Sequence, residues 1–345
     1  MRVAIVGAGA VGLRVARHLS DAPGMERLAI TDTDAGRAGA VAASIGSPAG
    51  AAALLPNLFN GSDVAVLCGP SGGGEHRRWA EAALEAGAHV VSVADGIDDV
   101  RALLELDLEA RERNLAVVTG AGFSPGLSCV LASHAGTELT AVDEVHVAKA
   151  GTGGPACARQ HRQAQRTGAS EWRDGAWIRR RSGSGRKLCW FPEPVGGRDC
   201  YRAGVADGLV LVPAFPGVSR VSARVAASHR ERLASRVGVE PRPAASWLGL
   251  VKAANTDRLG AVRVEVRGRV GLTREVRVLG VVDRPATAAA AVAAVSALWA
   301  PAGRLARPGA GGLAELAGDT TAFLRDLALR GVRAAVFDAG AGVLA

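Results

Sequence analysis

Three glycines near the start of the chain have the spacing of a phosphate-binding loop. Arg2–Val6 is a short run rich in β-branched residues, which predicts a buried strand, and the sequence GAGAVG follows it directly. In such a loop the first glycine permits a tight turn, the second lets the backbone approach a pyrophosphate, and the third lets the next helix pack on the strand. The phosphates would rest on unpaired N–H groups at the helix start. We therefore predict dinucleotide contacts from Gly7, Gly9, Ala10, Val11 and Gly12.

A carboxylate follows the second predicted strand, residues 28–31. Asp32 comes 20 residues after Gly12, where a carboxylate accepts hydrogen bonds from ribose hydroxyls and repels a 2′-phosphate. Asp32 and Thr33 are therefore predicted cofactor contacts, and NAD is the predicted cofactor. Arg37 could accommodate a 2′-phosphate, so NADP remains the alternative. Asp32 could instead cap the next helix, a role that Asp34 would fill equally well.

Strands and helices alternate through the first third of the chain. Predicted strands at 64–68, 89–93 and 115–119 alternate with predicted helices at 75–86 and 97–113. This order predicts an α/β fold, with an N-terminal Rossmann domain (1–125) built on a doubly wound parallel sheet. Gly69 and Pro70 follow a central strand, so we predict that they line the dinucleotide site.

The periodicity changes after residue 137. Residues 142–149, 220–226, 262–267 and 275–279 alternate apolar and polar, which is typical of antiparallel strands. We predict a second α+β domain (126–284) of mostly antiparallel sheet, for substrate binding and oligomerisation, with the last two strands joined across Gly268–Gly271. Helices at Pro285–Trp299 and 319–330 place residues 285–345 in a C-terminal helical region that packs back on the Rossmann domain.

The positive charge of the chain is concentrated in one segment. The sequence has 41 basic and 33 acidic residues, a net charge of +8, and residues 158–187 hold nine basic residues against Glu171 and Asp174. This distribution argues against a nucleic-acid-binding surface, because no RNA-binding motif accompanies it. Two interpretations stay open. The segment is solvated loop charge, or a flap whose arginines, Arg179–Arg181 among them, recognise substrate carboxylates. Before it, residues 151–154 predict an anion-binding helix start, with Gly153, Gly154 and His161 as substrate contacts.

Composition excludes several other classes. The five cysteines contain no C-x-x-C pair, and no zinc-binding pattern appears among cysteines and histidines, so we expect neither disulfides nor a metal. The longest apolar stretch, 286–300, is shorter than a membrane span. No signal peptide precedes the first strand. We expect a soluble cytoplasmic protein that binds neither membranes nor nucleic acid.

Three segments carry a resemblance to a known family. They are DVAVLCGP (63–70), AALEAGAHVV (82–91) and GAGFSPGLS (120–128). Over about the first 130 residues the chain resembles the saccharopine dehydrogenase superfamily, which includes saccharopine reductases, lysine 6-dehydrogenases and polyamine-forming synthases. In members of this family an acidic residue commonly follows the strand of His89 more closely. In this chain the acid after that strand, Asp95, comes later. The resemblance implies that Phe123, Ser124 and Pro125 face the nicotinamide and substrate; locally, Ser124 is predicted to cap the following helix.

An amine substrate needs a base as well as a hydride acceptor, because a protonated amine cannot release hydride from its carbon. Lys149, His146 and Asp95 are the predicted catalytic residues, although His146 and Lys149 alternate to opposite faces of one strand. The resemblance implies an NAD(P)-dependent oxidoreductase acting on the C–N bond of a carboxylated amino acid or opine-like secondary amine, as a homodimer. The alternatives are a lysine 6-dehydrogenase-like terminal-amine deaminase, an NAD-bound transferase of the polyamine-forming type, and a non-catalytic NAD-responsive binding protein.

Overall fold

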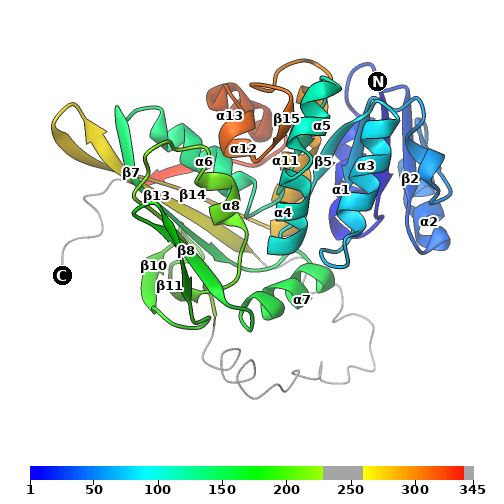
Figure 1. The fold of residues 1–345 in the computed structure, drawn as a ribbon. Coiled ribbons are helices and arrows are strands. Elements are labelled where there is room, and N and C mark those ends of the chain that lie inside the picture. The colour runs from blue at the N-terminus through cyan, green and yellow to red at the C-terminus, as the bar shows by residue number, and fades with distance from the viewer. Residues whose placement is uncertain (228–258, 338–345) are drawn as a thin grey trace, which may run out of the picture.

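The chain folds around two β-sheets that lie side by side (Figure 1). The structure is a computed structural model and describes residues 1–227 and 259–337. One sheet has seven strands and the other has nine. The predicted pairing of a Rossmann domain with a mostly antiparallel second domain is confirmed.

The first sheet is entirely parallel. Its strand order is β15-β6-β5-β4-β1-β2-β3, so the direction of winding reverses between β1 and β4. Ligands of doubly wound sheets bind at this reversal, beyond the carboxyl ends of the strands. The strands are β1 (Arg2–Val6), β2 (Arg27–Thr31), β3 (Ala49–Ala51), β4 (Val64–Leu67), β5 (His89–Ser92), β6 (Ala116–Val118) and β15 (Gly309–Gly311).

The helices of this domain follow the predicted order with one difference. The single helix predicted over 97–113 is divided into α4 and α5, so that prediction is wrong. Asp107 is the first residue of α5. It accepts a hydrogen bond from the Ala310 N–H at 2.9 Å, which connects the start of α5 to β15. The helical elements are α1 (Ala10–Ser20), α2 (Ala35–Ile45), the 3₁₀ turn η1 (Pro56–Phe59), α3 (Glu75–Glu85), α4 (Ile97–Leu104) and α5 (Asp107–Glu112).

The second sheet is antiparallel except where β12 pairs with β7 in parallel. Its main path is β10-β11-β12-β7-β13-β14-β16, and β8 joins it through β12 and carries β9. The β13–β14 hairpin turns at residues 271–272, whereas Gly268 lies within β13, where a Cβ would meet the Ala141 carbonyl oxygen at 2.0 Å. The strands are β7 (Ala141–Ala150), β8 (Ala169–Arg173), β9 (Ala176–Arg180), β10 (Lys187–Trp190), β11 (Gly197–Arg202), β12 (Arg220–Ala226), β13 (Gly260–Val270), β14 (Thr273–Asp283) and β16 (Ala335–Phe337).

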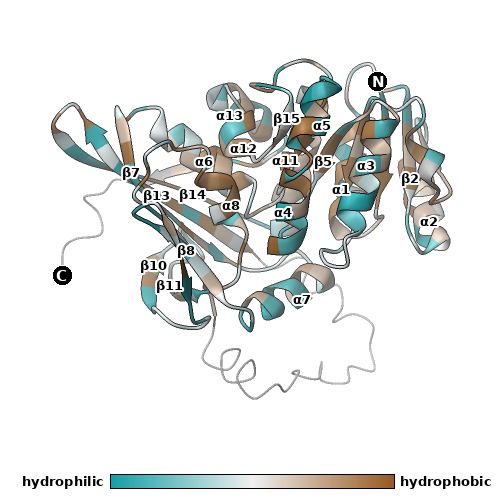
Figure 2. Ribbon diagram, in the orientation of Figure 1, coloured by the Kyte–Doolittle hydropathy of each residue, from teal (hydrophilic) through white to brown (hydrophobic). Residues whose placement is uncertain are grey.

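An alanine-rich helix, α11 (Pro285–Trp299), joins the two sheets. It is almost wholly buried and packs on α1, β4 and β5 of the first domain, on α6 of the second, and on α13 near the C-terminus. Figure 2 shows that α8 is largely apolar whereas α7 is largely hydrophilic. None of the helices in the described part of the chain is long and apolar enough to cross a bilayer. The remaining helices are α6 (Leu127–Gly136), α7 (Pro155–Ala164), α8 (Asp207–Leu211), α12 (Leu313–Leu316) and α13 (Thr320–Ala328).

The end of α11 allows a test of this packing. Trp299 is 1% exposed, stacks edge-on against Phe323 at 4.9 Å, and donates its indole N–H to Asp326 at 2.7 Å. We expect Trp299→Ala to lower the free energy of unfolding by about 3–5 kcal/mol in urea denaturation, because it leaves a cavity and removes one of the hydrogen bonds to Asp326. Leu329→Ala, at a side chain that is 80% exposed, should change it by less than about 0.5 kcal/mol. Equal effects of the two substitutions would contradict the buried role of Trp299.

Candidate functional site

The glycine loop between β1 and α1 has the geometry that a pyrophosphate requires. Gly7 has a φ of +101°, and a Cβ there would lie 2.8 Å from the Cys68 carbonyl carbon. A Cβ on Gly12 would lie 1.8 Å from the Gly7 carbonyl oxygen. Gly9 is the N-cap of α1, and no side chain caps the helix. The start of α1, where Ala10 and Val11 follow Gly9, is therefore open to an anion, and the predicted loop residues fit a dinucleotide.

Asp32 connects the end of β2 to this loop. One carboxylate oxygen accepts the Ala8 N–H at 2.7 Å, and the other accepts the Asp34 N–H at 2.9 Å and lies 3.4 Å from Arg37 Nη1. Burial raises the pKa of Asp32, but these backbone hydrogen bonds and Arg37 lower it overall. The cap of α2 is Asp34, which accepts the Arg37 N–H at 3.0 Å. Asp32 is therefore not needed as a cap, and it stays ionised beside the cofactor loop.

The loop after β4 abuts the glycine loop. A Cβ on Gly7 would lie 2.8 Å from the Gly69 nitrogen, so Gly69 and Pro70 stand next to the predicted pyrophosphate position. His76 links this loop to β5. Its Nε2 lies 3.1 Å from the Gly69 carbonyl oxygen, and its Nδ1 lies 2.8 Å from Ser92 Oγ. Burial lowers the pKa of His76, so the ring is neutral and Nε2 donates to Gly69. Sequence reasoning missed this supporting role, since a histidine in a helix gives no sign of its partner.

Two of the predicted catalytic residues lie together where the two sheets meet. Lys149, near the end of β7, donates from Nζ to the Ser124 carbonyl oxygen at 2.9 Å. Asp95 follows β5 and accepts the Ser71 hydroxyl at 3.2 Å. Burial raises the pKa of Asp95, and the positive charge of Lys149 opposes that shift. The two side chains therefore act on each other electrostatically, and both are half-buried.

The start of α7 belongs to the same region. Gly154 is its N-cap with a φ of +149°, and no side chain caps the helix. Cys157 lies in the first turn of α7. Burial and, to a smaller extent, Asp95 raise the pKa of its thiol and Lys149 opposes them, so that the pKa is about 11. Cys157 thus lies close to both charged groups. Gly153 packs closely on the start of α11, and His161 stands one helical turn after Cys157.

The segment between β6 and α6 differs from its prediction. Ser124 does not cap α6, so that prediction is wrong: the N-cap is Gly126, where a Cβ would lie 2.2 Å from the Gly122 carbonyl oxygen. The Ser124 hydroxyl donates instead to Asp207 at 2.7 Å. Phe123 is buried in the core, and Pro125 packs against Gly120, where a Cβ would lie 2.7 Å from the proline ring.

Asp207 is a site residue that sequence reasoning missed. It begins α8, is fully buried, and accepts hydroxyl hydrogen bonds at 2.7 Å from both Ser124 and Ser128. It is also close enough to Asp95 to raise the pKa of that carboxyl. The available signal was composition: Asp207 is the only charged residue between Arg202 and Arg220, within a long apolar run.

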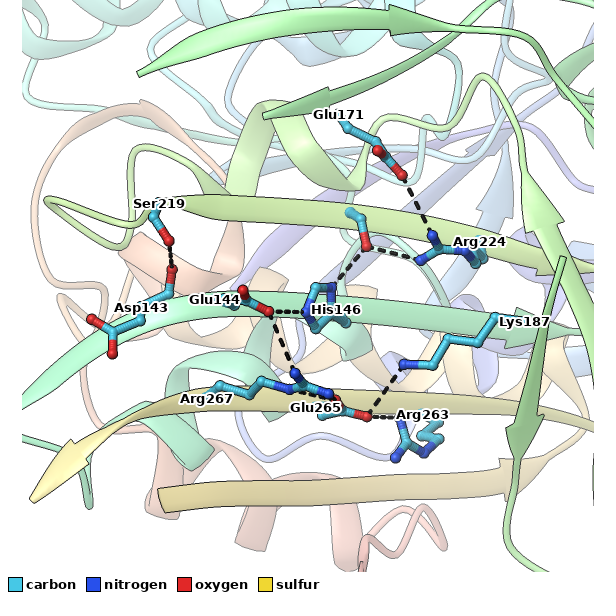
Figure 3. Close-up of polar contacts among 11 residues, drawn as sticks. Asp143, Glu144, His146, Glu171, Lys187, Ser219, Arg224, Arg263, Glu265 and Arg267 are labelled. Atoms are coloured by element: carbon cyan, nitrogen blue, oxygen red, sulfur yellow. Dashed lines mark hydrogen bonds and ion pairs between the residues drawn. The ribbon is translucent and has the colours of Figure 1, made fainter. Parts of the chain in front are cut away.

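His146 lies on the other face of the second sheet (Figure 3). Its Nδ1 lies 2.8 Å from Ser222 Oγ, and its Nε2 lies 2.7 Å from a Glu144 carboxylate oxygen. Lys149, three positions later on β7, points to the opposite side. Burial lowers the pKa of His146. The structure thus does not bring His146 to Lys149 and Asp95.

The basic segment contributes to this same outer face. Lys187 lies 3.7 Å from Glu265, a strand neighbour of His146, and Arg180 lies 3.7 Å from Glu171. Both glutamates are buried. Burial would raise the pKa of Glu265, but Arg263, Lys187 and Arg267 lower it to about 2. The charge of Arg180 and Lys187 therefore balances buried glutamates, so neither open interpretation, solvated charge or a carboxylate-binding flap, describes these two residues.

Comparison with known proteins agrees with this fold. Residues 1–106 match a family described as an oxidoreductase family with an NAD-binding Rossmann fold. Saccharopine dehydrogenase (L-Glu forming) from Saccharomyces cerevisiae aligns over 98% of this chain and 100% of its own, with a TM-score of 0.71 and 15% identity. Amine dehydrogenase from Mycobacterium smegmatis aligns over 92% of this chain and 96% of its own, with a TM-score of 0.53 and 12% identity. No curated protein matches the sequence.

The fold and the glycine loop define an NAD-binding protein of the oxidoreductase type, with an antiparallel second domain. Its fold is that of saccharopine dehydrogenase, which confirms at the level of fold the resemblance carried by residues 63–128. The family match also confirms the predicted cofactor class.

The choice between the two dinucleotides depends on Asp32. Asp32→Ala should weaken NAD binding about tenfold, because a charged hydrogen-bond acceptor for the ribose is lost, and should weaken NADP binding less. Dissociation constants from fluorescence titration give the comparison. Asp34→Asn is the matched control, since asparagine still caps α2. An equal loss of both dinucleotides would show that Asp32 only holds the loop through Ala8.

Proposed function

We propose that this protein is an NAD(P)-dependent dehydrogenase acting on the C–N bond of an amino acid or an opine-like secondary amine. The observation that carries the proposal is that Asp95, which follows β5 and bonds to Ser71, lies within electrostatic reach of Lys149 near the end of β7. Rossmann-fold ligands bind in this position. The likeness in fold to saccharopine dehydrogenase and to an amine dehydrogenase supports the same class of reaction.

The residues divide the chemistry between them. When bound, the nicotinamide ring accepts or supplies the hydride. Asp95, whose pKa is raised by burial, takes the proton from the substrate nitrogen, so that the neutral amine is the reacting form. Lys149 keeps Asp95 ionised enough to act as the base, because its positive charge opposes the effect of burial.

The surrounding backbone would orient a carboxylated substrate. The uncapped start of α7, with Gly153 and Gly154, presents N–H groups to a substrate carboxylate. His161 completes the proposed substrate contacts, whereas Phe123, Ser124 and Pro125 are buried and support the site from within the core. This arrangement fits an amino-acid-like ligand.

The function is tested with a panel of amino acids, primary amines, and keto acids with amines, each assayed with NAD and NADP by absorbance at the nicotinamide band. We expect reduction of the cofactor with at least one amino acid or secondary amine. Ammonia release would identify a terminal-amine substrate, and formation of a carbonyl product with a second amine would identify an opine-like one. Product formation without net cofactor reduction would contradict the proposal in favour of a transferase.

Lysine substitutions test the assigned pair. Lys149→Met should lower kcat at a pH near the pKa of Asp95, because a smaller fraction of Asp95 is then ionised, and should leave the Kd for NAD unchanged. Because the Lys149 charge lowers the pKa of Asp95, its loss should also move the acidic limb of the kcat/KM profile to higher pH. Lys149→Arg should keep that limb near its original position, since arginine retains the charge.

Lys187→Met provides the matched control, because Lys187 lies on the outer face of the second sheet with Glu265. We expect it to leave both kcat and the pH profile unchanged. If Lys149→Met behaved in the same way, the proposed pair would be wrong.

A further inference from the structure

Two of the five cysteines lie together at one end of the second sheet. β10 and β11 pair antiparallel, with Lys187 opposite Cys200 and Cys189 opposite Arg198. Cys189 and Cys200 are therefore diagonal neighbours on one face of this strand pair, and both belong to the same buried cluster. The Cys200 thiol donates a hydrogen bond to the sulfur of Cys189. Both side chains are free thiols in the structure, and their sulfur atoms are neighbours.

The surroundings of Cys189 favour its thiolate form. The hydrogen bond from Cys200 lowers the pKa of Cys189 to about 7, although burial opposes this shift. The nearby cations that lower it further are Lys187, Arg263 and Arg224. The same hydrogen bond, together with burial, raises the pKa of Cys200, so that thiol keeps its proton. The pair thus holds one nucleophilic sulfur beside one protonated sulfur.

The other three cysteines have the opposite character. Cys68 and Cys157 are more exposed than Cys189, yet burial raises their pKa to about 12 and about 11. Cys129 is fully buried, and burial raises its pKa to about 12. The thiolate is the form of cysteine that reacts with oxidants. Exposure alone would therefore place Cys68 and Cys157 first in reactivity, whereas thiolate character places Cys189 first.

We propose that Cys189 and Cys200 form a peroxide-reactive thiol pair that closes to a disulfide. Only Cys189 has to meet the oxidant. It is 5% exposed on β10, the end strand of the sheet, where a molecule as small as hydrogen peroxide can approach it from the sheet edge. Cys200 is fully buried and reacts only with its neighbour. The pair lies with Lys187 on the outer face of the sheet, so this inference is independent of the proposed function.

The reaction has two steps. The Cys189 thiolate attacks one oxygen of hydrogen peroxide, the O–O bond breaks, hydroxide leaves, and a sulfenic acid forms on Cys189. The Cys200 sulfur then attacks the Cys189 sulfur. The S–S bond forms as the S–O bond breaks, and the Cys200 proton leaves with the hydroxyl group as water. The two sulfurs together lose one pair of electrons, and one peroxide is reduced to hydroxide and water.

The disulfide would change the end of the sheet in two ways. β10 is joined to the sheet only through β11, so the new bond adds a covalent link to a strand that backbone hydrogen bonds hold on one side. It also removes the negative charge that the Cys189 thiolate places near Arg224. The modification therefore acts on the strand edge and on the charges of the outer face.

Limited oxidation of the reduced full-length protein tests the pair. The protein is treated with hydrogen peroxide at about pH 8, where Cys189 is mostly thiolate. Free thiols are then alkylated in denaturant, and the peptides are analysed by mass spectrometry. We expect a cross-linked peptide joining Cys189 and Cys200 to form at least about tenfold faster than oxidation of Cys68 or Cys157. Earlier oxidation of either of those two, or absence of the cross-link, would overturn the proposal.

Two variants separate the roles of the two sulfurs. Cys200→Ser keeps a hydrogen-bond donor beside Cys189 but cannot form the disulfide, so oxidation should stop at a Cys189 sulfenic acid that dimedone traps. Cys189→Ser should leave Cys200 as a thiol under the same conditions. The matched control, Cys157→Ser, should form the cross-link at the original rate. Failure of dimedone to trap Cys189 in Cys200→Ser, or unchanged oxidation of Cys200 in Cys189→Ser, would show that Cys189 is not the reactive sulfur.

Discussion

The hydrogen bond between Lys149 and the carbonyl oxygen of Ser124 connects the two halves of the molecule at the candidate site. Ser124 belongs to the segment that leaves β6 of the Rossmann sheet, and Lys149 belongs to β7 at the centre of the second sheet. The hydroxyl of the same serine is fixed by Asp207. This short segment, whose glycines permit its tight backbone path, therefore fixes the Lys149 side chain against the Rossmann domain near Asp95. A Cβ at Gly126 would collide with Gly122, so the path has little freedom to change.

The sequence predicted correctly the features that depend on the size of one side chain or on the periodicity of one strand. Gly7 was predicted to permit a tight turn and Gly12 to let the helix pack closely on the strand, and added Cβ atoms would collide with Cys68 and with the Gly7 carbonyl oxygen respectively. Alternation along β7 placed His146 and Lys149 on opposite faces, as the structure has them. Such predictions succeed because they depend on local geometry alone, which periodicity and residue size determine.

The remaining features depend on which segments meet in space, and periodicity does not contain that information. Ser124 had the residue type of a helix cap, yet it bonds to Asp207, 83 positions away in the chain. Lys187 of the basic segment pairs with Glu265, which is buried on the outer face of the second sheet, so the sequence of the segment did not show this counter-charge. Glu265 comes from β13, far along the chain. Long-range pairing thus changed the interpretation of a charge surplus that composition alone had located correctly.

The two faces of the second sheet differ in how much positive charge lies near their carboxylates. On the outer face each buried glutamate has several cations near it: Arg202 and Arg224 lie within 4 Å of Glu171, so that side is internally balanced. On the inner side, burial and Asp207 raise the pKa of Asp95, and Lys149 is the cation that opposes them. A carboxylate whose pKa is raised in this way is suited to accept a proton near neutral pH. Under the proposed function, a cationic amine would bring a further positive charge to Asp95, and loss of its proton to Asp95 would leave the neutral amine that hydride transfer requires.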